Sequence, residues 1–212
     1  MGSADFVRFI ELFAARLRDR RQELTDLDSK IGDADHGINM DRGFTAVTVK
    51  LPDVAGSDLG ALSKTVGMTL ISTVGGASGP LYGTFFLRLA TAFGDRVQAE
   101  PADLGAALRA GLEGVQARGH AVLDDKTMVD AMLPAVAAYE ASVANGGLAH
   151  ALRAAAEAAA IGRDRVTPLV ARKGRASYLG ERSAGHQDPG ATSTTILFES
   201  LRDAVVDTDS GG

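Results

Sequence analysis

Apolar side chains recur at helical spacing in most segments of this 212-residue chain, and this periodicity constrains the fold more than any other feature. Residues 4–20 show it clearly, with Phe6, Ile10, Phe13 and Leu17 on one face. Alanine is abundant and tryptophan is absent, a composition that favours closely packed helices. The sequence therefore predicts an all-α protein.

The periodicity divides the chain into eight expected helices, which we expect to form a single domain over residues 1–212. The helices cover residues 4–20, 38–51, 59–73, 80–93, 101–118, 126–143, 148–170 and 189–206. Ser3, Asp125 and Asp188 are the expected caps, because short polar side chains can accept hydrogen bonds from the first free N–H groups of a helix. Residues 207–212 are expected to be disordered.

Proline and glycine set the expected helix ends. Pro52 is expected to stop the second helix, and Pro80 to be the first residue of the fourth. Gly119 suits the residue that follows the fifth helix. The alanine-rich seventh helix is expected to break or bend near Gly162 and Pro168.

Composition argues against several classes of protein. The chain has no cysteine, which excludes disulfides and thiolate metal sites, and the cytoplasm is the expected compartment. We expect neither a signal peptide nor a membrane span, because the apolar runs are short. The formal net charge is −5 and there is no basic stripe, so nucleic acid is not an expected partner.

The first candidate site is an aspartate-rich stretch near the amino terminus, residues 24–44. Asp28, Asp33 and Asp35 stand close together there, with no lysine or arginine between Ile31 and Asp41. Carboxylates set so close repel one another unless a cation neutralises them. A site of carboxylate oxygens without thiolates suits a hard ion such as Mg²⁺.

Calcium is the natural competitor, but the sequence does not fit its common loop. Counted from Asp33, an EF-hand loop needs glycine where this chain has Ile38 and glutamate where it has Phe44. A purely structural interpretation stays open, in which Asp28 caps a helix while Asp33 and Asp35 face solvent.

The second candidate site is the glycine-rich loop GGASGP, residues 75–80. Its glycines precede the expected first helical residue, Pro80, and so lie at a helix N-terminus. Free backbone N–H groups and the positive end of the helix dipole can hold phosphate there. The pattern is neither a GxxxxGK[ST] loop nor a GxGxxG fingerprint, so a simple tight turn is equally open.

The third candidate is the stretch RKGRASYLGERSAGHQDPG, residues 172–190, which is too polar for a core segment. Long ordered loops of this kind are often functional. In an up-and-down bundle the connections from odd to even helices lie at the same end, so all three loops are expected at one rim. Carboxylates, N–H donors and basic side chains there would form a site for a metal and a nucleoside diphosphate.

Three motifs carry a specific resemblance. DSKIGDADHGINMDRGF, GMTLISTVGGASGPLYGTFF and ARKGRASYLGERSAGHQDPGATST closely resemble the L subunit, or nucleotide-binding domain, of bacterial dihydroxyacetone kinases, in the same order and spacing. The resemblance spans nearly the whole chain and is weakest over residues 95–125 and 140–170. It implies an eight-helix, barrel-like bundle that carries ADP or ATP with Mg²⁺ at one end.

The resemblance also implies a set of site residues. Asp28, Asp33 and Asp35 would be the metal ligands. The nucleotide would contact His36, Gly37, Ile38, Asn39, Gly76, Ala77, Ser78, Gly79, Gly119, Met128, Arg175, Asp188, Pro189 and Gly190. The stretch before Lys126 follows no motif of the family, which leaves the adenine side of the site least defined.

The family's activity implies the function we expect. ADP would stay bound as a coenzyme that alternates with ATP, with a pair of Mg²⁺ ions. A phosphotransferase-system M subunit would recharge it, and the phosphoryl group would pass to dihydroxyacetone held by a K subunit. Even two Mg²⁺ ions leave such a site negatively charged, so Arg175 is the expected catalytic cation.

Other functions stay open at this point. The chain could exchange ATP, as an L subunit of a split triose or tetrose kinase. It could instead be an ADP-dependent binding module that reports to a transcription regulator. A metal-dependent hydrolase is a further interpretation, since three aspartates can also activate water.

Overall fold

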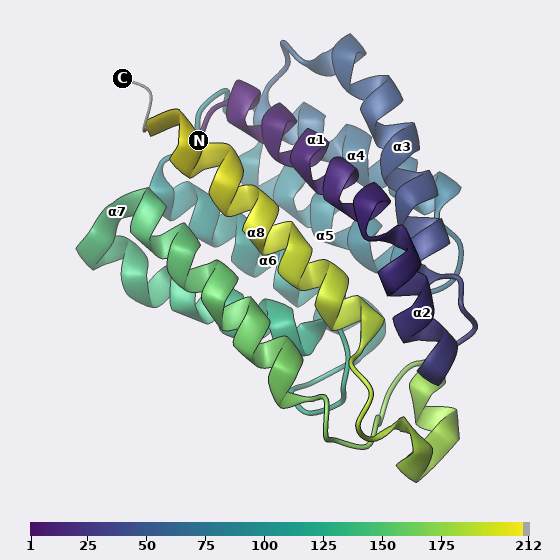
Figure 1. The fold of residues 1–212 in the computed structure, drawn as a ribbon. Helices are drawn as coiled ribbons and strands as arrows, with labels where there is room; N and C mark the ends of the chain where they lie inside the picture. Colours follow the sequence, from purple (N-terminus) through teal and green to yellow (C-terminus); the bar gives the residue numbers. More distant parts are fainter. Residues whose placement is uncertain (210–212) are drawn as a thin grey trace.

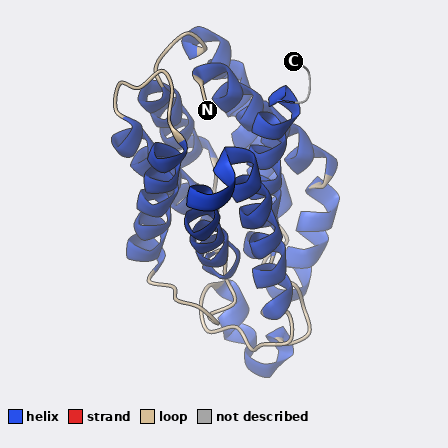
Figure 2. Cartoon of the chain, turned by 90° about the vertical axis from the view of Figure 1, so that its left-hand side faces the viewer, coloured by secondary structure: helices blue, strands red, loops and turns tan. Residues whose placement is uncertain are grey.

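The structure is a computed structural model that describes residues 1–209. Its helices are α1 (Ser3–Asp19), α2 (Arg21–Ile31), α3 (His36–Val54), α4 (Leu59–Thr73), α5 (Ser78–Phe93), α6 (Pro101–Gly119), α7 (Val129–Arg165), the 3₁₀-helix η1 (Arg175–Ser183) and α8 (Pro189–Asp209). Within these residues no strand forms, apart from one isolated bridge between Gly2 and Gln98 (Figure 2). The prediction of an all-α protein is confirmed.

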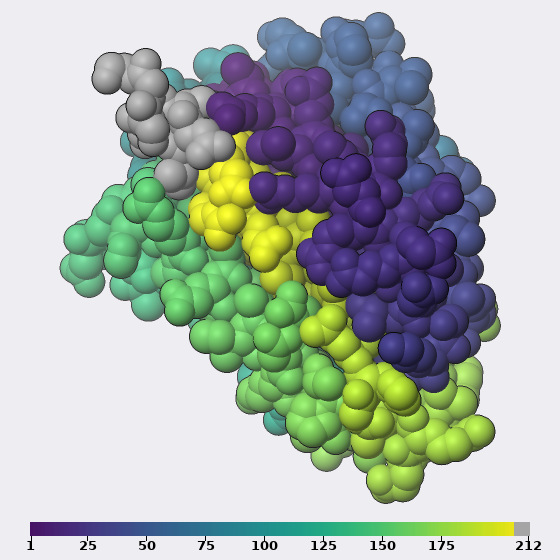
Figure 3. Space-filling model, in the orientation of Figure 1, coloured from purple at the N-terminus to yellow at the C-terminus, as the bar shows by residue number. Residues whose placement is uncertain are grey.

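Seven of the helices pack in a closed ring. Around it, α1 contacts α3, α3 contacts α4, and the order continues through α5, α6, α7 and α8 back to α1. Helix α8 lies between α1 and α7 (Figures 1 and 3). The shorter α2 continues from α1 towards one end, where it contacts α3 and η1 (Figure 1). The expected barrel-like bundle is therefore present.

Aromatic side chains fill the middle of the ring. Phe13 of α1 meets Phe44 of α3 edge to face with ring centroids 4.6 Å apart, and Phe86 of α5 contacts Phe44 from the other side. All three side chains are fully buried, and burial of each contributes roughly 1.5–3 kcal/mol to stability. These contacts hold α3 and α5 together, the two helices that follow the aspartate-rich and glycine-rich loops.

The first correction concerns the segment before the aspartates. Residues 21–31 form the separate helix α2, so Asp28 lies on a helix rather than in a loop. Leu24, Asp28 and Ile31 occupy its buried face at helical spacing. Ser3 is not a cap: α1 begins at Ser3, whose hydroxyl donates to the carbonyl of Ser57.

Two prolines lie inside helices that we expected them to delimit. Helix α3 begins at His36 and continues through Pro52 to Val54, and α5 begins at Ser78, two residues before Pro80. Pro80 is tolerated because N–H groups in the first helical turn have no intrahelical partner to lose.

Two further boundaries differ. Gly119 is the last residue of α6, and the left-handed position after it is taken by His120, with φ of 51°. Asp125 does not cap the next helix, because α7 begins at Val129 and the Asp125 carboxylate accepts instead from Val122 N.

The sixth and seventh expected helices are the two halves of α7. They meet at Gly147, where φ of 70° and ψ of −173° interrupt the helix. Gly162 stays helical. Glycine permits close packing there, because a Cβ would lie 2.1 Å from the carbonyl oxygen of Asp130. The expected disorder of residues 207–212 is wrong as far as Asp209, which is helical, and residues 210–212 lie outside the described part.

Candidate functional site

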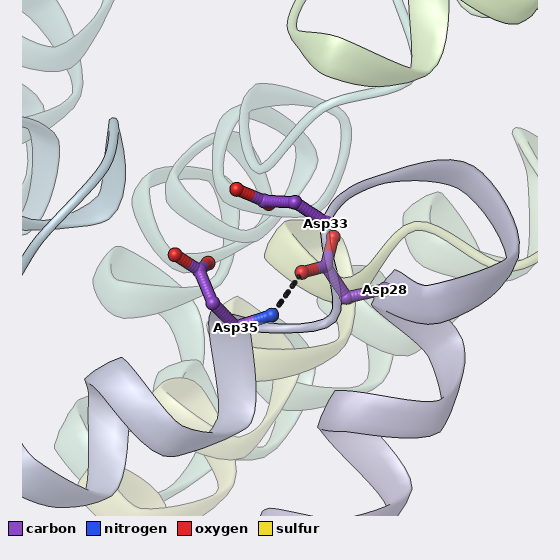
Figure 4. Close-up of side chains that lie close together, drawn as sticks. All are labelled: Asp28, Asp33 and Asp35. Atoms are coloured by element: carbon purple, nitrogen blue, oxygen red, sulfur yellow. Dashed lines mark hydrogen bonds between the residues drawn. The ribbon is translucent and has the colours of Figure 1, made fainter.

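Three carboxylates converge where α2 ends and α3 begins. One oxygen from each of Asp28, Asp33 and Asp35 lies within 4.8 Å of the others (Figure 4). The site residues predicted as metal ligands are thus brought together. This set of hard oxygen donors fits a divalent cation such as Mg²⁺, which relieves the repulsion among the carboxylates.

Backbone geometry fixes the Asp28 carboxylate. Its Oδ2 accepts from Asp35 N at 2.8 Å and from His36 N at 3.1 Å. Gly32 is needed beside it, since a Cβ there would lie 2.0 Å from Asp28 Oδ1. The Asp35 side chain caps no helix N–H, so its carboxylate remains available to a ligand.

The glycine loop meets this cluster through a hydroxyl group. Ala77 precedes α5 and Ser78 begins it, so free N–H groups of the first turn lie beside the cavity. The Ser78 Oγ lies 3.0 Å from Nδ1 of His36, the residue that follows Asp35 in the sequence. Gly76 has φ of 64° and open space around it, as a loop approached by a ligand needs.

His36 lies at the centre of a buried polar chain. Its Nε2 is 2.9 Å from Ser193 Oγ of α8, which in turn lies 2.8 Å from the Tyr82 hydroxyl of α5. Burial lowers the pKa of His36 to about 4, although the neighbouring Asp28 carboxylate opposes this shift. The imidazole is therefore neutral at physiological pH and orients Ser78 without adding charge.

The third loop contributes a cation and a buried acid. Arg175, the first residue of η1, places Nη2 3.0 Å from Asp33 Oδ2. Asp188 caps α8 as expected, accepting from Ala191 N at 2.7 Å. Burial raises the pKa of the Asp188 carboxyl to about 7, against the opposing effect of that hydrogen bond.

The three aspartates, the glycine-rich loop, His36, Arg175 and Asp188 line one cavity at the end of the bundle. Its lining comprises Asp28, Ile31, Asp33, Asp35, His36, Gly75, Gly76, Ala77, Ser78, Leu81, Tyr82, Lys126, Thr127, Met128, Lys173, Gly174, Arg175, Ala176, Asp188, Pro189 and Gly190. The three loops expected at one rim do meet there. A fourth connection, residues 120–128, joins them.

Five predicted nucleotide contacts do not line this cavity. Gly37 packs α3 against α2, since a Cβ would lie 2.1 Å from Arg21 O, and Gly79 packs against Val74 O in the same way at 2.2 Å. Ile38 is exposed, and Asn39 is buried with its Oδ1 accepting from Arg42.

Gly119 is the fifth of these residues and lies in an adjoining hollow. This hollow is mainly apolar and is shared with Met128; its other apolar lining includes Leu81, Val115 and Ala121. A hollow of this kind, which shares Met128 with the main cavity, suits a flat aromatic group such as a nucleobase.

Sequence reasoning missed several lining residues. Lys126 and Thr127 were expected in the sixth helix, but α7 begins only at Val129 and both residues lie in the connection between α6 and α7. This connection joins the fifth expected helix to the sixth, so it too falls at the same rim. Tyr82 follows the glycine loop by one helical turn. Lys173 lies in the third loop, but nothing in its pattern distinguished it from the other basic residues there.

Comparison with known proteins gives consistent results. The model of the DAK2 domain matches residues 30–203. The ADP-binding subunit of the PEP-dependent dihydroxyacetone kinase of Escherichia coli is 50% identical over 179 residues, which cover 84% of this chain and 85% of that subunit. The ADP-binding subunit of the PTS-dependent enzyme of Lactococcus lactis is 40% identical, with 94% and 96% covered.

A solved structure supports the same assignment. The dihydroxyacetone kinase of C. freundii in complex with AMP-PNP and Mg²⁺ superposes with a TM-score of 0.70 at 27% identity. The match covers 93% of this chain but only 33% of that longer chain. No helix within residues 1–209 is long and apolar enough to cross a membrane. This chain therefore belongs to the DAK2 domain family, among the ADP-binding L subunits of dihydroxyacetone kinases.

Proposed function

We propose that the chain is the phosphoryl-donor subunit of a phosphoenolpyruvate-dependent dihydroxyacetone kinase. It holds ADP with Mg²⁺, accepts a phosphoryl group on ADP from a phosphotransferase-system M subunit, and passes it to dihydroxyacetone held by a K subunit. One observation carries the proposal: the three carboxylates and the N-terminus of α5 line a single cavity, in a chain 50% identical to an ADP-binding subunit.

The aspartates would hold the metal. Asp28 is fixed by backbone N–H groups, while Asp33 and Asp35 are less buried and can adjust to a ligand. Bound Mg²⁺ supplies charge neutralisation at phosphate oxygens. A pair of ions and the alternation of ADP with ATP are part of the proposal.

The other loops would hold the nucleotide. N–H groups around Ala77 and Ser78 would bind its phosphates, and the neutral His36 would hold the Ser78 hydroxyl in place. The apolar hollow at Gly119 and Met128 would take the adenine. Gly190 lies beside the Asp188 carboxylate and completes the wall of the cavity.

Arg175 would act at the transfer step. A third phosphate adds negative charge to a site that already holds three carboxylates, so a cation is needed to stabilise the transferring group. Arg175 lies at the cavity and is still partly exposed, with 65% of its side chain accessible. It can therefore turn from Asp33 towards a phosphate.

The recharging route separates this proposal from its alternative. The relatives recharged by PEP or the PTS match this chain over most of their length, whereas the C. freundii kinase carries the similar region as about a third of a longer chain. This favours an M subunit as the phosphoryl source over exchange of free ATP. The regulatory role and the cytoplasmic location stay predictions.

The deciding experiment measures turnover of dihydroxyacetone with a purified K subunit. We expect little activity with ATP alone and rapid activity once M subunit and phosphoenolpyruvate are added. Rapid turnover with ATP alone, and no gain from the M subunit, would overturn the recharging route. Denaturing the purified chain should release adenine nucleotide whichever route operates.

A further inference from the structure

We propose that Lys126 is a positioning residue, whose ammonium group fixes the loop of residues 166–188 at the cavity, and that it is not a phosphate ligand. A lysine in the lining of a nucleotide cavity would ordinarily be assigned to the phosphates. The hydrogen bonds of Lys126 point elsewhere.

All three ammonium donors of Lys126 are in use. Nζ donates to the carbonyl oxygens of Thr167 at 2.9 Å, Leu169 at 2.9 Å and Ser183 at 2.6 Å. A lysine has three donors and no acceptor, so none is left for a phosphate oxygen. The residue is 1% exposed, and its head group is enclosed by these three carbonyl oxygens.

The three acceptors lie at both ends of one segment. Thr167 and Leu169 follow α7, and Ser183 ends η1, so the segment between them carries Arg175. A backbone hydrogen bond joins the same two segments. Arg172 N donates at 3.0 Å to the carbonyl oxygen of Asp125, the residue before Lys126. One side chain therefore closes the base of the loop from which Arg175 reaches the site.

The backbone of Lys126 is strained into this arrangement. Its φ is 64°, a left-handed conformation that costs a residue with a Cβ roughly 1–2 kcal/mol. Ser183 is a second fixed point: its hydroxyl accepts from Ala171 N at 2.9 Å and donates to Gly180 O at 2.6 Å. Strain of this kind persists only where the surroundings hold it, here through the three carbonyl contacts.

The first test needs neither partners nor substrate. Amide hydrogen exchange is measured on the nucleotide-free full chain for peptides within residues 172–186, comparing Lys126→Met with Lys173→Met, an exposed lysine of the same cavity. We expect exchange in the loop to rise by about tenfold or more in Lys126→Met only, with α4 and α5 unchanged. Unchanged exchange in the loop would overturn the proposal.

Lys126→Gln covers the case in which the methionine variant does not fold. The glutamine amide retains two donors, whereas methionine has none. We therefore expect hydrogen exchange in the loop to rise less in Lys126→Gln than in Lys126→Met. Exchange in this variant equal to that of the unaltered chain would overturn the proposal.

The second test rests on the proposed function and asks what the loop positions. Phosphoryl transfer to the K subunit is measured for Lys126→Met, Arg175→Ala and the double variant. If Lys126 acts by placing Arg175, its removal slows transfer by about tenfold or more alone but hardly at all when Arg175 is already absent. Equal losses in both backgrounds would overturn the positioning role.

The two tests fail in different ways. Absence of transfer by the unaltered chain would count against the proposed function, while the hydrogen-exchange result for Lys126 would stand. Affinities for AMP, ADP and ATP complete the comparison: a loss in Lys126→Met that grows with each added phosphate would identify a phosphate ligand and overturn the proposal.

Discussion

The guanidinium of Arg175 and the carboxylate of Asp33 form an ion pair of 3.0 Å across the mouth of the cavity. The pair joins η1 to the loop between α2 and α3, two segments far apart in sequence. Both side chains are partly exposed, and ion pairs of this kind are worth only about 0–1 kcal/mol. Arg175 can therefore exchange Asp33 for a stronger partner such as a phosphate at small cost.

Arg175→Ala should slow phosphoryl transfer more than it weakens nucleotide retention. Cationic side chains that stabilise the transferring group are worth about 10³-fold or more in related reactions, whereas metal and backbone contacts carry most of the ground-state binding. We expect a loss in turnover of at least about 100-fold with nucleotide content nearly unchanged. Arg175→Lys is the matched control for charge; equal losses in turnover and nucleotide content would identify a binding residue only.

Replacing Asp33 and Asp35 together by asparagine should empty the site of metal and nucleotide. The change removes two of three converging negative charges but keeps the size of the side chains. We expect the purified double variant to carry at least about 100-fold less magnesium and adenine nucleotide than the unaltered chain. Asp26→Asn, which changes an exposed carboxylate on α2, should have no effect; a fully loaded double variant would contradict the proposed metal site.

Two glycines of the glycine-rich loop, residues 75–80, should respond differently to alanine. In Gly79→Ala the new Cβ would meet Val74 O at 2.2 Å, an overlap that costs roughly 1–3 kcal/mol. Gly76→Ala meets open space, and only its φ of 64° opposes the change, by about 1 kcal/mol. Urea unfolding should rank Gly79→Ala as the less stable; the reverse order would show that the helix start adjusts freely.

Much of the site was predictable because it depends on local spacing. Asp33 and Asp35 lie two residues apart in a short loop, so their convergence needs no long-range information. The meeting of the three loops followed from bundle topology, which sends alternate connections to the same end. The same rule also covers the connection of residues 120–128, but Lys126 was expected in the helix that follows, because the later start of α7 at Val129 was not predicted.

What the sequence did not predict depends on contacts between distant segments. The resemblance implies Gly37 and Gly79 as nucleotide contacts, but the sequence does not show that a backbone oxygen packs against each of them in the fold. The pairing of His36 with Ser193 spans 157 positions, and no spacing rule anticipates it. Helix α2 was missed for a different reason: its polar residues obscured the helical spacing of Leu24, Asp28 and Ile31.

The buried His36 should make the stability of the metal-free chain depend on pH. Burial lowers its pKa to about 4 in the folded state, whereas a histidine in the unfolded chain titrates near ~6.5. Between these values the unfolded state binds more protons, so this contribution to stability is present above the unfolded pKa and is lost as the pH falls towards 4. The buried Asp188 carboxyl opposes this slope, because its pKa is raised to about 7 in the folded state and the folded state therefore binds more protons in this range. Urea unfolding in EDTA between about pH 7 and pH 4 measures the sum of the two effects, and the part due to His36 is the difference between the unaltered chain and a His36 variant.

A matched pair of variants assigns this slope to His36. His36→Gln should make the chain relatively more stable as the pH falls from about 7 to 4, because glutamine does not titrate and only the opposing effect of Asp188 remains. His120→Gln should leave the pH dependence unchanged, since His120 is exposed at the end of α6. In the unaltered chain, ¹⁵N spectra should show a neutral imidazole throughout the range in which free histidine becomes charged. A charged imidazole near pH 6 would mean that water reaches the chain of Ser78, His36 and Ser193, and that Ser78 is not held as the structure places it.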